Sequence, residues 1–168
     1  MVIYLIRHGE AVTIDETPTK SDPDRNLTIE GKEKLYQFSR AFRSIGLQSE
    51  LILTSPYKRA YETAAIVAEA MEPTPKIEEC DLLAPGSETE ALINHLNQRN
   101  DFNSVVIVGH EPFLGNLASL LISGKNSLNI RFKKGGVCKI EISELPPKSI
   151  GELQYLLTPK IIKSVKKK

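Results

Sequence analysis

The sequence has few cysteines, no long N-terminal apolar run and almost no net charge. Its two cysteines, Cys80 and Cys138, are far apart and form no CxxC pair, which argues against a disulfide framework and a zinc site. The apolar stretch MVIYLI ends at Arg7 and is too short for a signal peptide or a membrane span. We expect a cytoplasmic protein whose cysteines are packed thiols.

The charge balance excludes a strong global field. Lys and Arg number 22 against 21 Asp and Glu, which gives a formal net charge of +1. A balance of this kind does not favour nucleic acid or a membrane surface as a partner. We therefore expect no nucleic-acid partner and no membrane partner, and we expect a monomer. Any attraction for anions must come from a local group of basic residues.

Sequence motifs for nucleotide and metal chemistry are also missing. The chain has no Walker loop and no GxGxxG element. His110-Glu111 is not followed by the histidine of a zinc helix, which would fall at Leu114. We expect no metal and no cofactor.

The length of 168 residues and the 40% hydrophobic content suit one globular domain. We place this domain at residues 1–159. The remaining tail, Lys160–Lys168, is rich in lysine, and we expect it to fray in solvent rather than bind an acidic partner.

Short β-branched runs alternate with segments of helical period, and this alternation predicts an α/β fold. Val2–Ile6 is nearly all apolar, as expected of a central strand covered by helices on both faces. We therefore expect three α/β/α layers around a mostly parallel sheet. The other expected strands are Leu51–Thr54, Ser104–Val108, Val137–Ser143 and Glu152–Thr158.

Four helices are expected from apolar spacing and from capping residues. Thr28 can cap a helix that ends at Gly46, and Ser55-Pro56 supplies an N-cap and a first-turn proline for the next. Ser87 and Glu90 fit a capping box that opens a third helix. A fourth helix follows Gly109–Pro112.

Charged residues follow three of the expected strands directly. They lie in Arg7-His8-Gly9, in Ser55–Arg59 and in Gly109-His110. Ligands bind beyond the carboxyl ends of parallel strands, where helix N-termini also open. If these strands are parallel neighbours, two imidazoles and two guanidiniums meet at one edge and form a site for a dianion.

Phosphate is the dianion that these side chains suit. A guanidinium can bond two phosphate oxygens and stays charged at any working pH. A neutral imidazole can attack phosphorus while a second one donates a hydrogen bond to the transferring group. Taken singly, Arg7, His8, Arg59 and His110 could each be structural, although Arg59 is a cation near a helix N-terminus, which hints at a bound anion. We expect His95 to be a surface or boundary residue.

Several segments resemble the signature blocks of the histidine phosphatase superfamily, which has the phosphoglycerate-mutase-like fold. They are "LIRHGEA", "SPYKRAYETA" and "VGHEPFLG", with "RNLTIEG" matching a further structural block, and they span roughly residues 1–125. The resemblance implies that His8 is the nucleophile that becomes phosphorylated. It also implies that Arg7, Arg59 and His110 complete the phosphate pocket. These three residues and His8 are the four that the strand-end pattern indicates.

Within that superfamily the chain looks most like the SixA-type phosphohistidine phosphatases. It shares their small size, the "GHEP"-type turn and a Leu83-Ala84-Pro85-Gly86 segment. Larger members insert a helical cap that often carries a carboxylic acid for protonating the leaving group, and this chain has little room for one. Asp81 and Glu88 lie near where that acid would come, so they are the candidates for a general acid, although no motif matches them.

Leaving-group chemistry favours phosphohistidine as the substrate. A phosphate ester expels an alkoxide and gains much from an acid, whereas phosphohistidine expels imidazole, whose pKa is about 6.5. An open pocket also admits a histidine on a protein surface, such as that of a phosphotransfer domain. We expect a phosphohistidine protein phosphatase, with the charged loop Ala11–Asn26 as a candidate substrate contact. The alternatives are a small-molecule phosphatase or mutase and an inactive phosphohistidine-binding module.

Overall fold

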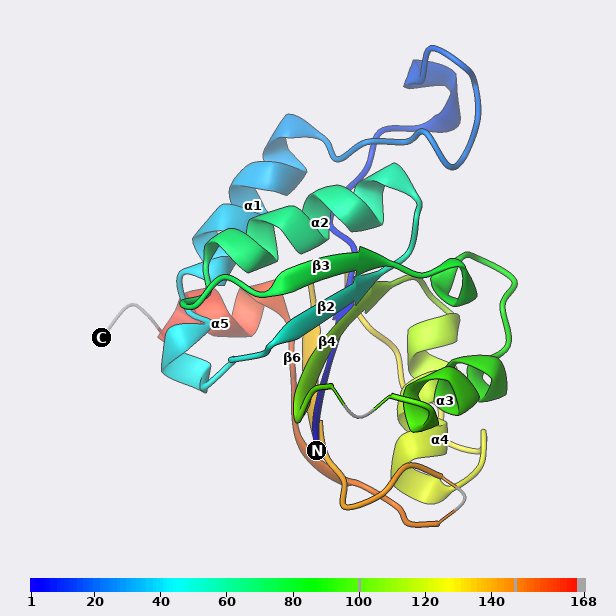
Figure 1. The fold of residues 1–168 in the computed structure, drawn as a ribbon. Helices are drawn as coiled ribbons and strands as arrows, with labels where there is room; N and C mark the ends of the chain where they lie inside the picture. Colours follow the sequence, from blue (N-terminus) through cyan, green and yellow to red (C-terminus); the bar gives the residue numbers. More distant parts are fainter. Residues whose placement is uncertain (100, 147, 166–168) are drawn as a thin grey trace.

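The computed structural model describes residues 1–99, 101–146 and 148–165 and shows a six-stranded sheet (Figure 1). The strand order is β3-β2-β4-β1-β5-β6. The first four of these pair in parallel, while β5 is antiparallel to both of its neighbours. The strands are β1 (Val2–Arg7), β2 (Leu51–Thr54), β3 (Lys76–Glu79), β4 (Ser104–Gly109), β5 (Val137–Glu141) and β6 (Glu152–Leu157). The expected α/β class with a mostly parallel sheet is confirmed.

Helices cover both faces of this sheet and complete three layers (Figure 1). One face carries α1 (Ile29–Ser39), α2 (Lys58–Glu69) and α5 (Pro159–Val165). The opposite face carries α3 (Thr89–Asn97) and α4 (Phe113–Ser123). No helix within the described ranges is long and apolar enough to cross a bilayer.

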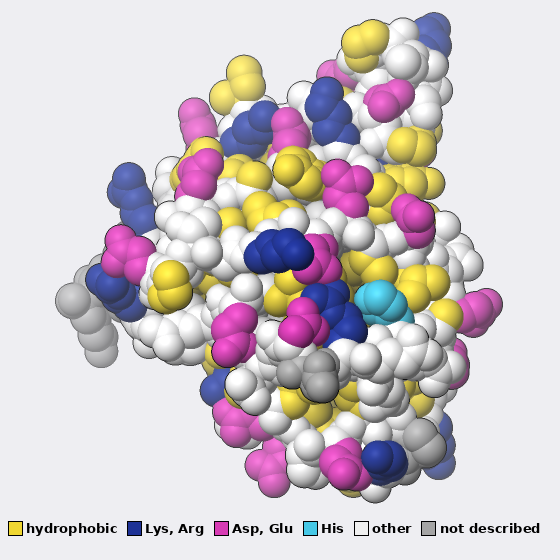
Figure 2. Space-filling model, viewed as in Figure 1, with side chains coloured by type: hydrophobic (Ala, Val, Ile, Leu, Met, Phe, Trp, Pro, Cys, Tyr) yellow, Lys and Arg dark blue, Asp and Glu magenta, His cyan; other side chains and the backbone are white. Residues whose placement is uncertain are grey.

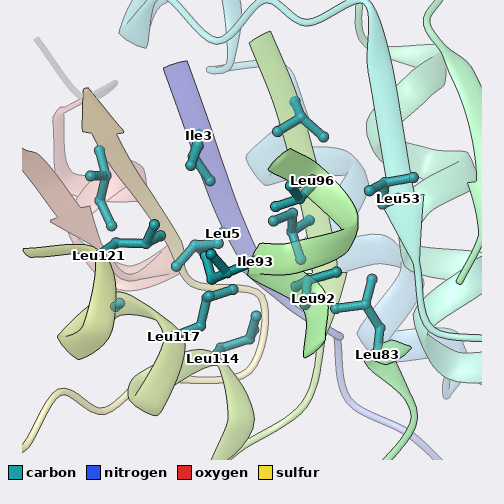
Figure 3. Packing of buried hydrophobic residues seen from close by; sticks show 14 of the residues in the cluster. Ile3, Leu5, Leu53, Leu83, Leu92, Ile93, Leu96, Leu114, Leu117 and Leu121 are labelled. Atoms are coloured by element: carbon teal, nitrogen blue, oxygen red, sulfur yellow. The ribbon is translucent and has the colours of Figure 1, made fainter. Parts of the chain in front are cut away.

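The central strand β1 serves two cores at once. Ile3 and Leu5 belong to the core beneath α3 and α4, where Figure 3 shows them facing leucines such as Leu117. Tyr4 and Ile6 belong to the core beneath α1 and α2. Because successive side chains of a strand point to opposite faces, a strand covered on both sides must be apolar at every position. This explains the unbroken run before Arg7.

The helix expected from Thr28 to Gly46 is two helices. Thr28 is its N-cap, as expected, since the hydroxyl accepts a hydrogen bond from the Gly31 N–H at 2.9 Å. However, α1 ends at Ser39, and a 3-10 turn over Arg43–Ile45 then leads to Gly46 at φ 69°. The apolar residues keep facing the core through the tighter turn, so their spacing alone did not reveal the break.

Two expected helix caps are wrong. The N-cap of α2 is Tyr57, and α3 follows Glu88, in both cases without a side-chain cap. The Ser55 hydroxyl is instead bonded to the ring of His110, and the Ser87 hydroxyl donates to the carbonyl of Asp81. Each serine therefore has another partner that its position along the chain did not indicate.

Two elements were missed. The edge strand β3 is KIEE, which is too polar and partly exposed to show the pattern of a buried strand. Residues expected to fray instead form α5, because Ile162 is buried against the core shared by α1 and α2. Residues 166–168 lie outside the described part of the chain.

Both cysteines are free and buried, as expected for packed thiols. Burial raises the pKa of Cys138 to about 12 and also raises that of Cys80. Neither thiol is therefore activated as a nucleophile.

Candidate active site

Sheet register brings the three charged turns to one edge. Arg7 at the end of β1 is paired with Gly109 at the end of β4, and Thr54 of β2 is paired with Val108. The pairing continues past the strands, since the His8 N–H donates to the Gly109 carbonyl and the Ser55 N–H to the Val108 carbonyl, each at 3.0 Å. The chain segments that follow β1, β2 and β4 therefore start side by side at the same edge of the sheet.

The four residues expected in the site come together there. The ring centroids of His8 and His110 are 5.0 Å apart. The exposed fractions are 7% for His8, 5% for Arg59 and 4% for His110, and Arg7 is half-buried. Polar side chains this deeply buried need partners or a ligand to offset the loss of hydration.

A chain of hydrogen bonds fixes the tautomer of His8. Its Nδ1 lies 2.7 Å from the carbonyl oxygen of Gly9, and only a protonated Nδ1 can bond to a carbonyl. The proton of a neutral ring is therefore on Nδ1, and the lone pair is on Nε2. The same Gly9 peptide donates its N–H to the hydroxyl of Thr63, which donates to the carbonyl of Arg59. In this way α2 holds the peptide that orients the ring.

Both imidazoles are kept neutral by their surroundings. Burial and the charges of Arg59 and Arg7 lower the pKa of His8 to about 3, although its hydrogen bond to the Gly9 carbonyl acts in the opposite direction. Burial and the charge of Arg59 likewise lower the pKa of His110 to about 4. Near neutral pH, Nε2 of His8 is thus unprotonated, and its lone pair lies in a cationic environment.

The second imidazole is oriented as a donor. Nε2 of His110 is 2.9 Å from the hydroxyl oxygen of Ser55, and that oxygen already accepts the N–H of Tyr57 at 3.3 Å. The serine proton is then free to be donated to Nε2, which places the ring proton of His110 on Nδ1.

Three buried nitrogen atoms in this site lack partners. They are Nε of Arg7, Nε of Arg59 and Nδ1 of His110, and over the described residues no other buried side-chain nitrogen or oxygen lacks a hydrogen bond. Buried donors are normally satisfied, and leaving one unpaired costs about 1–3 kcal/mol. Three idle donors around one nucleophile are suited to an anion with several oxygens.

The guanidinium of Arg7 is held from the β5 side. Its Nη1 donates to the carbonyl of Phe132 at 2.8 Å, and the N–H of Phe132 donates to a carboxylate oxygen of Glu111, also at 2.8 Å. Burial lowers the pKa of Arg7, which the nearby Glu111 partly counteracts. A backbone carbonyl as the bonded partner leaves the positive charge available to a ligand.

The guanidinium of Arg59 is held by Asp22, a residue that the sequence did not single out. Its two terminal nitrogens donate to the carbonyl and a carboxylate oxygen of Asp22, at 2.7 and 3.0 Å. Arg25 donates to the other carboxylate oxygen at 2.8 Å. Partial burial raises the pKa of Asp22, but the hydrogen bonds from Arg25 and Arg59 outweigh this and lower it. Asp22 and Arg59 are 37 positions apart, so only the charge-rich loop hinted at a role.

The sequence offered two candidates for a general acid. Asp81 begins the 3-10 turn after β3, Glu88 precedes α3, and both are exposed. Within the described ranges neither is hydrogen-bonded to, or ion-paired with, the four site residues. His95 is half-buried in the last turn of α3, as expected. Three or more His, Cys, Asp or Glu side chains do not gather as metal ligands anywhere in the described residues.

Comparisons with known proteins show the family of the chain. The family model of the histidine phosphatase superfamily (branch 1) matches residues 3–84. An uncharacterized protein of Picosynechococcus sp. is 31% identical over 165 residues, covering 95% of this chain and 98% of its own. The phosphohistidine phosphatase SixA of Escherichia coli is 24% identical over 127 residues, covering 74% and 76%.

Solved structures show the same fold. The protein histidine phosphatase SixA complexed with tungstate aligns with a TM-score of 0.84 at 21% identity, covering 96% of this chain and 99% of the other. A putative α-ribazole-5'-P phosphatase from Escherichia coli aligns with a TM-score of 0.72 at 20% identity, covering 95% and 98%. Their fold is the three-layer fold described above.

Proposed function

Because the chain belongs to the histidine phosphatase superfamily, we propose that it is a phosphohistidine protein phosphatase that works through a phosphorylated His8. The observation that carries the proposal is the set of three idle donors around the unprotonated Nε2 of His8. Two arginine nitrogens and one imidazole nitrogen are free to donate hydrogen bonds to oxygens of a phosphoryl group. These donors are in place before the reaction, so they stabilise transition-state charge without reorganisation.

In the first step, Nε2 of His8 attacks phosphorus in line with the bond to the substrate imidazole. The P–Nε2 bond forms as the substrate P–N bond breaks, and a substrate ring protonated on its other nitrogen leaves as neutral imidazole. Arg7, Arg59 and His110 bind the three oxygens of the phosphoryl group during this transfer. The proton of His8 stays on Nδ1, and its hydrogen bond to the Gly9 carbonyl stabilises the cationic phosphorylated ring.

In the second step, water attacks the phosphorylated His8. The P–Nε2 bond breaks and its electron pair returns to Nε2, while the proton of the water goes to the departing phosphate. His8 is regenerated in the tautomer in which it began. Neither step needs a cofactor.

The state of Asp22 supports phosphohistidine as the substrate class. This carboxylate contacts Arg59 at the site, and its lowered pKa keeps it ionised near neutral pH, so it cannot protonate a departing alkoxide. Imidazole needs no carboxylic acid to leave. The resemblance to SixA, which is named a phosphohistidine phosphatase, agrees with this substrate. A cytoplasmic location is part of the proposal, since both cysteines are free thiols.

A small-molecule phosphatase or mutase is the second candidate. The fold shared with an α-ribazole-5'-P phosphatase supports it. That reaction needs an acid, and within the described residues Asp81 and Glu88 make no hydrogen bond or ion pair with the site residues. A binding module without activity is the third candidate, and it leaves the free lone pair on Nε2 of His8 without a purpose.

Substrate comparison tests the proposal. We expect kcat/KM for a phosphotransfer domain phosphorylated on histidine to exceed that for sugar phosphates, phosphoglycerate or α-ribazole phosphate by about 100-fold or more, a discrimination of roughly 3 kcal/mol. His8→Ala is the control for background hydrolysis. The reverse ranking contradicts the phosphohistidine assignment, and wild-type turnover equal to that of His8→Ala supports the binding module.

A further inference from the structure

The segment between α4 and β5 forms a basic edge beside the phosphate pocket. Arg131, Lys133 and Lys134 are exposed, whereas Phe132 between them is fully buried. The backbone of Phe132 is anchored on both sides, by Nη1 of Arg7 and by the carboxylate of Glu111. The three cations are therefore held next to the site by the contacts that position Arg7.

A second pocket opens beside this segment, with a volume of about 390 Å³. Its lining includes Leu35, Pro159 and the backbone of Gly9, and four lysines line it as well. The lysines are Lys34, Lys133, Lys134 and Lys160. We call this pocket the basic groove. Its volume is at the lower end of the roughly 300–1,000 Å³ of pockets that hold small ligands, so it has room for one apolar side chain.

The basic groove and the phosphate pocket share a wall. Gly9, which lines the groove, carries the carbonyl that holds Nδ1 of His8. Gly135, which also lines it, donates its N–H to the carbonyls of Arg7 and His8 at 3.0 and 3.2 Å. A side chain in the groove would thus lie against the backbone that orients the His8 ring.

Positive charge at the groove is only partly compensated. Glu10 is the one acid in its lining, and it contacts Lys34 at 3.3 Å and Lys134 at 3.7 Å. Lys34 also pairs with Glu30, outside the lining, at 2.7 Å. Throughout the described residues, Arg131, Lys133 and Lys160 have no ion-pair partner. On the face shown in Figure 2, by comparison, acidic and basic side chains are interspersed. A chain with a net charge of +1 thus concentrates cations beside its phosphate site.

We propose that the basic groove is the docking surface for the acidic flank of the phosphohistidine-bearing protein, which places one apolar side chain in the groove. This rests on the proposed function above. A histidine on a protein surface can reach His8 only if the surface around it also fits this protein. Complementary charge raises the rate of such an encounter and selects among partners.

Charge reversal beside the groove tests the proposal. Lys133→Glu is expected to lower kcat/KM about fivefold or more for a phosphotransfer domain phosphorylated on histidine, and Lys133→Glu with Lys134→Glu about tenfold or more. The same variants should hydrolyse free phosphohistidine within twofold of wild type, because the small substrate does not use the groove. Raising ionic strength should bring wild type toward the double variant.

Lys125→Glu is the matched control. Lys125 is exposed and follows α4, at the far end of that helix from His110, so the same charge change there should leave both substrates unaffected. Equal losses on the protein and on free phosphohistidine, or an equal loss in Lys125→Glu, overturn the docking surface.

Failure of the proposed function would give a different result: the wild-type protein would hydrolyse neither the phosphorylated phosphotransfer domain nor free phosphohistidine. Binding to anionic lipid vesicles that depends on Lys133, with protein turnover unchanged, would assign the groove to a membrane and also overturn the proposal.

Discussion

Arginines in two regions of the molecule have opposite surroundings. Arg99, after α3, donates Nε to Asp101 at 2.9 Å and Nη1 to Glu78 at 2.6 Å, and its guanidinium carbon lies 5.4 Å from the centroid of the Phe102 ring. The carboxylates raise its pKa. In the phosphate pocket, Nε of Arg7 and Nε of Arg59 are buried without any partner, and burial lowers the pKa of Arg7.

The difference separates a structural arginine from one arranged for a ligand. The Arg99 cluster is complete, so an added anion would have to displace Asp101 or Glu78. The pocket is incomplete and keeps the cost of unpaired donors until an anion binds. Burial without a full set of partners is therefore a better guide to function than charge or burial alone.

The largest expected effect comes from removing one arginine from each region. Arg59→Ala should lower kcat/KM for a phosphohistidine protein by about 10²–10³-fold, since it removes transition-state hydrogen bonds. Arg99→Ala should leave kcat/KM within about twofold and lower the free energy of unfolding by about 1 kcal/mol. Steady-state kinetics and urea denaturation measure the two effects. Equal catalytic losses would erase the distinction between the regions.

Acid should destabilise the two regions over different pH ranges. Folding depresses the pKa of His8 from 6.5 to about 3 and that of His110 from 6.5 to about 4, so the unfolded chain binds more protons. Their contribution is complete above pH 6.5 and is lost as pH falls toward 4, by about 1.4 kcal/mol per pH unit for each histidine. The pKa of Asp101 is lowered from 3.8 to about 2 by Arg99, so that cluster weakens only below about pH 4.

Urea denaturation between pH 7 and 4.5, without phosphate, measures this slope. His8→Asn should reduce it, and His95→Gln is the control for losing a histidine outside the pocket. An unchanged slope in His8→Asn would show that His8 is not held neutral by the fold.

The smallest expected effect concerns Asp22, whose carboxylate pairs with Arg59 in the way that Glu78 and Asp101 pair with Arg99. Asp22 occupies both terminal nitrogens of Arg59, so Asp22→Asn should remove a competing charge and tighten the binding of inorganic phosphate about fivefold. Glu78→Gln, which alters the Arg99 cluster, should leave phosphate affinity unchanged. Calorimetric titration measures both, and weaker binding in Asp22→Asn would mean that its charge supports the site rather than competes for it.

Much of the fold and the placement of the four site residues could be predicted from the sequence. Val2–Ile6 is apolar at nearly every position, which indicates a strand buried on both faces. Arg7 and His8 directly follow these residues, so the parallel pairing of β1 with β4 is enough to bring them close to His110. The polar strand β3 could not be predicted, because an edge strand has no buried face to impose a pattern.

The hydrogen-bond partners of hydroxyl and carboxylate side chains could not be predicted from the sequence either. Ser55 fits an N-cap by local rules, yet it bonds to His110, 55 positions away. Asp22 holds Arg59 through a loop whose path depends on tertiary contacts. Local patterns report which face of an element is buried, whereas such bonds depend on how distant segments meet.

The most direct test of the account is to identify the phosphorylated atom during turnover. The protein is mixed with a phosphotransfer domain phosphorylated on histidine and quenched under alkaline conditions, and the site of the acid-labile phosphoryl group is then mapped. The account expects the group on Nε2 of His8 in wild type and none in His8→Ala. Phosphate release by His8→Ala at the wild-type rate, or a label on another residue, would contradict it.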